Sequence, residues 1–96
     1  MIETFGNVLA EDLFDDKRTK ATRAFPADLR RTARRKLLYL HEATDLRDIR
    51  VPPGNRLEAL KGDRKGFHSI RINDRWRVVF RWSGGNAFKV EIVDYH

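Results

Sequence analysis

Three side chains that handle protons stand next to one another at the end of the sequence: the carboxylate of Asp94, the phenol of Tyr95 and the imidazole of His96. They follow a hydrophobic segment, residues 87–93, and a nearby segment is rich in arginine. This set suits cleavage of RNA without a metal, because the 2′-hydroxyl must lose a proton, the phosphate must be held by cations and the leaving 5′-oxygen must gain a proton. The alternatives are a frayed chain end and a surface that binds nucleic acid or protein without catalysis.

The charge of the chain is unevenly distributed. Its 96 residues include 20 Lys and Arg against 14 Asp and Glu, for a net charge of +6. Residues 1–16 hold five acids and no base, so residues 17–96 carry twenty bases against nine acids, a net of +11. A body this basic is typical of proteins that face a polyanion, most commonly nucleic acid. A solubilising surface or an acidic protein partner would explain the same charge.

Length and composition predict one small domain over residues 1–96, because 96 residues suffice for one hydrophobic core. The absence of cysteine excludes disulfides and thiolate metal sites and favours a reducing cytoplasm. No signal peptide or membrane span is expected, because no stretch approaches the roughly 20 apolar residues that a span needs. His41, His68 and His96 are scattered and no glycine-rich phosphate loop is present, so we expect neither a metal site nor a cofactor.

Apolar spacing predicts helices in the first half of the chain. Residues 8–14 fit a short helix, residues 17–23 are polar and are expected to be irregular, and residues 26–43 form the one long helix. Residues 44–50 add a further helical turn. One flank of the long helix is either a ridge that contacts phosphate or a partner, or a solvated face. Its bases are Arg30, Arg31, Arg34, Arg35 and Lys36.

The second half is expected to contain four strands, at residues 56–60, 67–72, 75–82 and 87–93. Short turn signals separate the last three, which predicts an antiparallel meander. The fold class is therefore α+β, a small antiparallel-rich sheet with the N-terminal helices packed on one face.

Alternation along the last two strands separates a core face from a polar face. The predicted core side carries Trp76, Val78, Phe80, Trp82, Phe88, Val90 and Ile92. The opposite side carries Arg75, Arg77, Val79, Arg81, Lys89, Glu91 and Val93. Continued alternation would turn Asp94 and His96 to the core side and Tyr95 to the other, so all three share one site only if the strand bends near Asp94.

Several separated motifs agree in order and spacing with those of one toxin family. They are L-E-A-L-K-G-D-R-K-G at residues 57–66, S-I-R-I-N-D-R-W-R at residues 69–77 and V-D-Y-H at residues 93–96. In these motifs the chain resembles the HigB branch of the RelE-like bacterial toxins, also called plasmid maintenance system killer proteins. The resemblance covers roughly residues 52–96, and before that it rests on length and helix placement.

The resemblance implies a RelE-like fold and the toxin of a type II toxin-antitoxin system. It implies a metal-independent, ribosome-dependent endoribonuclease that cleaves mRNA in the A site and so inhibits translation and growth. The implied partners are the ribosome, mRNA and a helix-turn-helix antitoxin of the HigA type. We expect this antitoxin to dock on the basic flank of the long helix together with the N-terminal segment.

Site residues carry over by position. Asp94, Tyr95 and His96 match the family's catalytic residues, and Lys61 and Arg77 match its phosphate-facing bases. Glu58 is a further catalytic candidate, and Arg64 and Arg75 are further candidates for binding RNA phosphate. Glu58 departs from the family, because the best-studied branch has a catalytic histidine at this position. Glu58 is either the base for the 2′-hydroxyl or a solvent-facing carboxylate paired with a cation. This departure keeps two alternatives open: a toxin of the same fold that poisons DNA gyrase, as ParE-type toxins do, or one that interferes with ribosome assembly.

Overall fold

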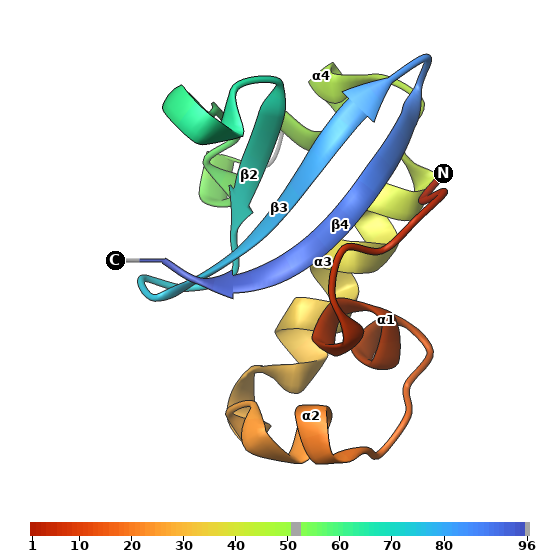
Figure 1. Cartoon of the computed structure of the whole chain (residues 1–96), viewed down its shortest axis with the longest axis vertical. Helices are drawn as coiled ribbons and strands as arrows, with labels where there is room; N and C mark the ends of the chain where they lie inside the picture. The colour runs from red at the N-terminus through yellow and green to blue at the C-terminus, as the bar shows by residue number, and fades with distance from the viewer. Residues whose placement is uncertain (51–52, 96) are drawn as a thin grey trace.

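Four strands in chain order form one antiparallel sheet in the computed structural model, which describes residues 1–50 and 53–95 (Figure 1). They are β1 (Glu58–Ala59), β2 (Phe67–Arg71), β3 (Trp76–Ser83) and β4 (Asn86–Asp94). Each strand pairs with the next one along the chain. The predicted meander is confirmed, and the first strand is shorter than predicted.

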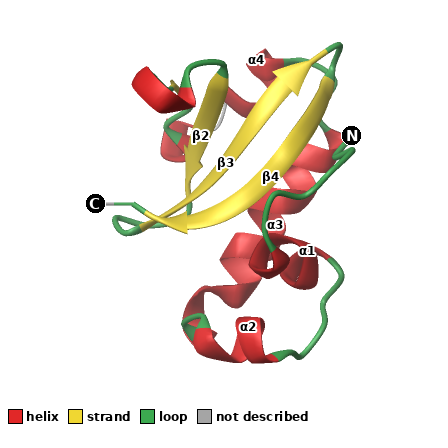
Figure 2. Cartoon of the chain, in the orientation of Figure 1, coloured by secondary structure: helices red, strands yellow, loops and turns green. Residues whose placement is uncertain are grey.

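The helices precede the sheet in the chain and pack on one side of it (Figure 2). They are α1 (Val8–Phe14), α2 (Lys20–Ala24), α3 (Arg30–Glu42) and α4 (Leu46–Arg50), with short 3-10 turns η1 (Ala27–Leu29), η2 (Pro53–Asn55) and η3 (Gly62–Arg64). In Figure 1, α3 runs behind β3 and β4, against which it packs. The predicted α+β class is confirmed.

The helix α2 corrects the expectation that residues 17–23 are irregular. Thr19 and Thr22 form a reciprocal cap, in which each side chain accepts a hydrogen bond from the main-chain N–H of the other. Thr22 is almost fully buried and also donates to the carbonyl of Lys17 at 3.0 Å. The helix therefore begins at a cap formed by polar side chains. A prediction based on the spacing of hydrophobic residues does not detect such a cap.

The hydrophobic core fills the space between α3 and the sheet. Leu37 and Leu40 of α3 meet Ile70, Phe80 and Val90 of the three long strands, and all five are fully buried. Within residues 1–50 and 53–95, no helix covers the opposite face of β3 and β4, as Figure 2 shows. We call this opposite side the open face of the sheet.

The alternation predicted for β3 is confirmed, and that predicted for β4 is partly wrong. The register runs from Val79 opposite Glu91 to Arg81 opposite Phe88, so β4 holds one extra residue at a bulge. Lys89 lies there with φ of +52° and donates its N–H to the Thr4 hydroxyl of the N-terminal segment. Because of the extra residue, the β4 side chains that precede the bulge point to the opposite face from the one predicted. Ala87 is therefore buried in the core in place of the predicted Phe88.

Candidate active site

The guanidinium of Arg77 lies at the centre of a polar group on the open face. Its Nη2 lies 3.5 Å from Oε1 of Glu58, while its Nη1 donates to Oγ of Ser69 at 3.3 Å and to the carbonyl of Arg56 at 3.4 Å. The ring of Tyr95 covers the guanidinium, with 5.2 Å between the arginine Cζ and the ring centroid. Only 13% of the Arg77 side chain is exposed. The cation is therefore held in one orientation by the protein itself.

The antiparallel register brings this group together. Glu58 on the edge strand β1 is the partner of Ser69 on β2, so both side chains point to the same face. Arg77 lies on that face of β3, next to Ser69 along the sheet. The N–H of Tyr95 donates to the carbonyl of Arg75 at 2.5 Å, which continues the ladder one residue past β4. The Tyr95 ring thereby reaches Arg77.

The turn that leads into β1 fixes the position of Arg56. Arg56 has φ of +45°, a left-handed conformation that costs a residue with a side chain about 1 to 2 kcal/mol. The preceding Asn55 is fully buried, donates to the carbonyl of Ile49 at 3.0 Å and accepts from Nζ of Lys36 on α3. Burial, with the nearby Arg35 cation, lowers the pKa of Lys36. The contact between Asn55 and Lys36 of α3 thus fixes the turn at Arg56, whose carbonyl accepts the hydrogen bond from Arg77.

The arrangement supplies the groups that phosphoryl chemistry needs. A fixed guanidinium donates to an anion with directed N–H groups, and it does so most strongly where water is partly excluded. The Glu58 side chain is 50% exposed, so it can accept a proton from a group that approaches the face. Tyr95 is 41% exposed and presents both a hydroxyl and a ring. A carboxylate, a guanidinium and a phenol therefore meet at one accessible place.

Asp94 has a different arginine partner from Tyr95. Its carboxylate accepts from Nε and Nη2 of Arg75 at 2.9 and 2.7 Å, and this hydrogen bond raises the pKa of Arg75. Asp94 is the register partner of Trp76, whose ring packs against the core, so Asp94 lies on the helix side of the strand end. The two residues are thus separated in the way that regular alternation predicts. The catalytic role of Asp94 stays a prediction.

Two of the remaining candidates, Lys61 and Arg64, lie at the turn η3 between β1 and β2. Arg64 donates to Glu91 on β4 at 3.0 Å, and its guanidinium also lies 5.2 Å from the ring centroid of Phe67. Since η3 joins β1 to β2, the Arg64 side chain crosses the face to reach β4. Lys61 is exposed at the start of η3. His96 lies outside the described residues.

Two contacts of Arg77 were missing from the sequence prediction. Ser69 lies two residues from Phe67 and from Arg71 on β2, so alternation alone would have placed it on the polar face. A small hydroxyl residue between bulky neighbours on that face is a usable signal. The Arg56 carbonyl has no sequence signal, because it depends on the left-handed turn and on Asn55.

Two further observations concern the described part of the chain. Within residues 1–50 and 53–95, no three His, Asp or Glu side chains gather so that they could hold a metal ion. No helix in the same ranges is long and apolar enough to cross a membrane.

Comparison with known proteins agrees with the motifs. The family described as the RelE-like toxin of type II toxin-antitoxin system HigB matches residues 3–96. This chain belongs to the HigB-like toxin family. The resemblance to the HigB branch is therefore confirmed, as is the assignment to type II toxin-antitoxin systems, whose toxins act with an antitoxin as partner.

Individual relatives of this HigB-like toxin were also found. Toxin HigB-1 of Vibrio cholerae serotype O1 is 44% identical over 73 residues, which are 76% of this chain and 74% of the relative. Endoribonuclease HigB of Proteus vulgaris is 42% identical over 41 residues, 43% of this chain and 45% of that protein. The solved structure of the YoeB/ParE toxin from Agrobacterium tumefaciens aligns over 99% of each chain, with 20% identity and a TM-score of 0.49.

Proposed function

We propose that this HigB-like toxin is an endoribonuclease that cleaves mRNA in the ribosomal A site and thereby inhibits translation and growth. The observation that carries the proposal is the meeting of Glu58 and Tyr95 on the partly buried guanidinium of Arg77. The Proteus vulgaris relative, which is named an endoribonuclease, supports it.

In the proposed reaction the 2′-oxygen attacks the adjacent phosphorus while the bond to the 5′-oxygen breaks, which leaves a 2′,3′-cyclic phosphate and a 5′-hydroxyl. Glu58 takes the 2′-proton. Arg77 donates its N–H groups to the phosphoryl oxygens as their negative charge grows, which favours the transition state over the bound substrate. Tyr95 or His96 protonates the leaving 5′-oxygen.

The other predicted residues support this reaction from a distance. The bond of Asp94 to Arg75 holds the strand end that carries Tyr95, so we assign Asp94 a positioning role. Lys61 is exposed and meets the phosphate of a flanking nucleotide. Arg64 and Arg75 already hold carboxylates, so each must exchange an ion pair to bind RNA and contributes less.

Dependence on the ribosome follows from the shape of the site. Of the candidate residues that the structure describes, Glu58, Arg77 and Tyr95 lie together on the open sheet face, and among these three Tyr95 offers an exposed aromatic ring on which a base could stack. Such a face gives a flexible RNA few fixed contacts, so the substrate must be positioned by something else before the 2′-oxygen lines up with the phosphorus. In this proposal the ribosome does that, in the cytoplasm, and a helix-turn-helix antitoxin of the HigA type neutralises the toxin.

The test is brief induction of the toxin in a bacterial host, followed by primer extension on abundant mRNAs. The proposal predicts new 5′ ends that fall at a fixed codon phase within translated regions and disappear with the Arg77→Ala variant. Intact messages accompanied by an SOS response would refute it in favour of gyrase poisoning. Intact messages with incomplete ribosomal subunits would instead point to interference with ribosome assembly.

A further inference from the structure

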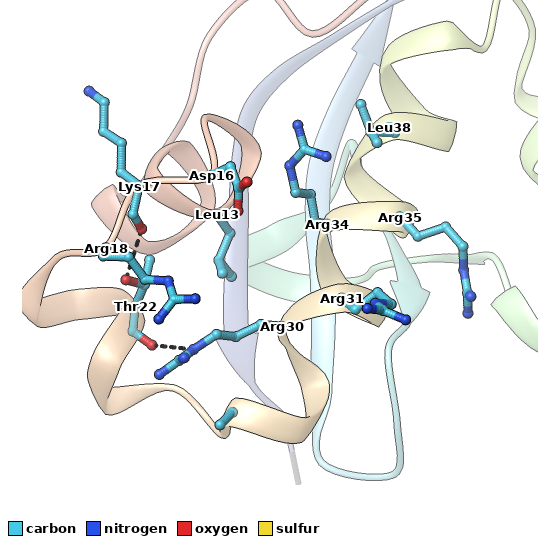
Figure 3. A pocket seen from close by; sticks show the side chains of 11 residues that line it. Leu13, Asp16, Lys17, Arg18, Thr22, Arg30, Arg31, Arg34, Arg35 and Leu38 are labelled. Carbon is cyan, nitrogen blue, oxygen red and sulfur yellow. Dashed lines mark hydrogen bonds between the residues drawn. The ribbon is translucent and has the colours of Figure 1, made fainter.

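A basic pocket lies among the N-terminal helices and is formed by elements other than β3, the strand that carries Arg77 (Figure 3). Its volume is about 560 Å³, within the range of pockets that hold a ligand or the side chains of a docked peptide. Its cations come from α3 and from the segment between α1 and α2: Lys17, Arg18, Arg30, Arg31, Arg34 and Arg35. Six cations and one carboxylate, Asp16, line it, so an occupant must bring negative charge.

The walls of the pocket are fixed by hydrogen bonds. Arg30 donates from Nε to the carbonyl of Thr22 at 3.0 Å, a bond drawn in Figure 3, and Arg34 donates to the carbonyl of Phe14 at 3.3 Å. The segment between the helices is tied by the Thr22 hydroxyl bond to Lys17 described above. Two arginines of α3 therefore join it to the α1 and α2 side. A partner would meet a surface that needs little reordering, which reduces the entropic cost of binding.

The lining also contains apolar surface. Leu13 of α1 and Leu38 of α3 line the pocket together with Ala27 of η1, and no aromatic side chain is among the lining residues. RNA would use the cations but would gain nothing from leucines, and its bases would have no ring on which to stack. A peptide with carboxylates around an apolar side chain complements both the rim and the floor.

We propose that this pocket docks an acidic segment of a protein partner, with an apolar side chain between Leu13 and Leu38 and carboxylates on the surrounding arginines. Membership of a type II toxin family supplies the partner, the antitoxin. The binding itself requires no nuclease activity, so it stands or falls independently of the proposed RNA cleavage.

The experiment measures fluorescence anisotropy of a labelled peptide, Asp-Glu-Leu-Glu-Asp-Leu-Asp-Glu, with the purified toxin at low salt. The test variant is Arg31→Glu with Arg35→Glu, two exposed residues of the pocket. The matched control is Arg47→Glu with Arg50→Glu, two exposed arginines of α4 with the same change in net charge. We expect about a tenfold or greater loss of affinity in the test variant and less than about threefold in the control.

Two further measurements in the same assay determine which kind of molecule occupies the pocket. A peptide with both leucines replaced by serine should bind about tenfold more weakly, because it cannot fill the apolar floor. Equal binding of both peptides, or equal weakening in both double variants, would overturn the proposal in favour of unspecific charge attraction. Tighter binding of hexauridylate that displaces the peptide would overturn it in favour of an RNA surface.

The fold of each variant is checked by its thermal midpoint. If the double variant is unfolded, NMR of the wild-type protein decides. Shifts confined to residues 13–18 and 27–38 on adding the peptide support the proposal, and shifts elsewhere overturn it.

Discussion

Replacing Arg77 by alanine should slow cleavage by at least about 10²-fold while leaving the protein folded. The guanidinium of Arg77 on the open face contacts Glu58, Ser69 and Tyr95 together. Loss of a fixed donor to a developing negative charge typically lowers the rate by about 10²- to 10³-fold. The full cation is removed here, so we expect the single-turnover rate on programmed ribosomes to fall by at least about 10²-fold. Arg77→Lys should recover only part of it, because an ammonium cannot keep the same directed contacts.

Arg77→Ala should lower the free energy of unfolding by about 1 to 3 kcal/mol, which leaves the protein folded. Glu58 is half exposed, so losing its ion pair removes at most about 1 kcal/mol. The buried hydroxyl of Ser69 loses a partner, which costs about 1 to 2 kcal/mol if water does not replace it. The sum is about 1 to 3 kcal/mol, which for a domain of this size corresponds to a drop of roughly 4 to 24 °C in the melting temperature. Circular dichroism melts measure this drop.

The matched control for Arg77 is Arg81→Ala on the same strand and face. Arg81 is exposed, and its guanidinium lies 6.0 Å from the ring centroid of Phe67. Arg81→Ala therefore removes the same charge as Arg77→Ala without changing a residue of the candidate site. We expect its rate to stay within about threefold of wild type, because charge at the rim mainly changes encounter. If Arg77→Ala cleaves as fast as Arg81→Ala while folded, Arg77 does not stabilise the transition state.

The other predictions concern Glu58, Tyr95 and His68. If Glu58 is the base, Glu58→Gln should slow single-turnover cleavage by about 10²-fold or more and Glu58→His should restore it at neutral pH; a Gln variant as fast as wild type would assign the base to another group. Tyr95→Phe should keep more activity than Tyr95→Ala, because the ring remains over Arg77; equal losses would show that only the hydroxyl matters. Burial lowers the pKa of His68, whose Nδ1 is buried without a partner. Protonation of His68 therefore opposes folding, and the contribution of His68 to the free energy of unfolding should fall as pH drops below about 6.5. In His68→Phe this dependence should be weaker in denaturant titrations, and parallel curves for the two proteins would contradict the assignment.

Local signals predicted most of the fold. The helical spacing of α1 and α3, the turn signals between strands and the alternation along β3 depend on near neighbours in the chain, and each is confirmed. The error on β4 has a non-local cause. The N-terminal segment lies along β4 in parallel, bridging Ile2 to Ala87 and Phe5 to Val90, and the bulge at Lys89 bonds to this segment. No pattern within residues 87–93 contains that contact.

For the candidate site too, local signals predicted some of the residues, and others depend on contacts that local signals do not contain. Alternation placed Arg77 on the face away from the core, and the family motif pointed to Glu58 and Tyr95, which the structure brings to the same guanidinium. Ser69 was overlooked because a serine in a strand is usually unremarkable on residue type alone. The pairing of Asp94 with Arg75 depends on side-chain rotamers at a strand end, which sequence spacing does not determine.

The most direct test of RNA cleavage at the open face compares one labelled mRNA in two states, free and bound to purified ribosomes with an empty A site. The toxin, the Arg77→Ala variant and the Arg81→Ala control are each mixed with both, and the initial rate of cutting is measured under single-turnover conditions. We predict rapid cutting at the A-site codon by wild type and Arg81→Ala, little cutting by Arg77→Ala, and little cutting of free mRNA by any of them. Equal rates on free and bound mRNA, or intact mRNA on ribosomes saturated with folded wild-type toxin, would contradict this account.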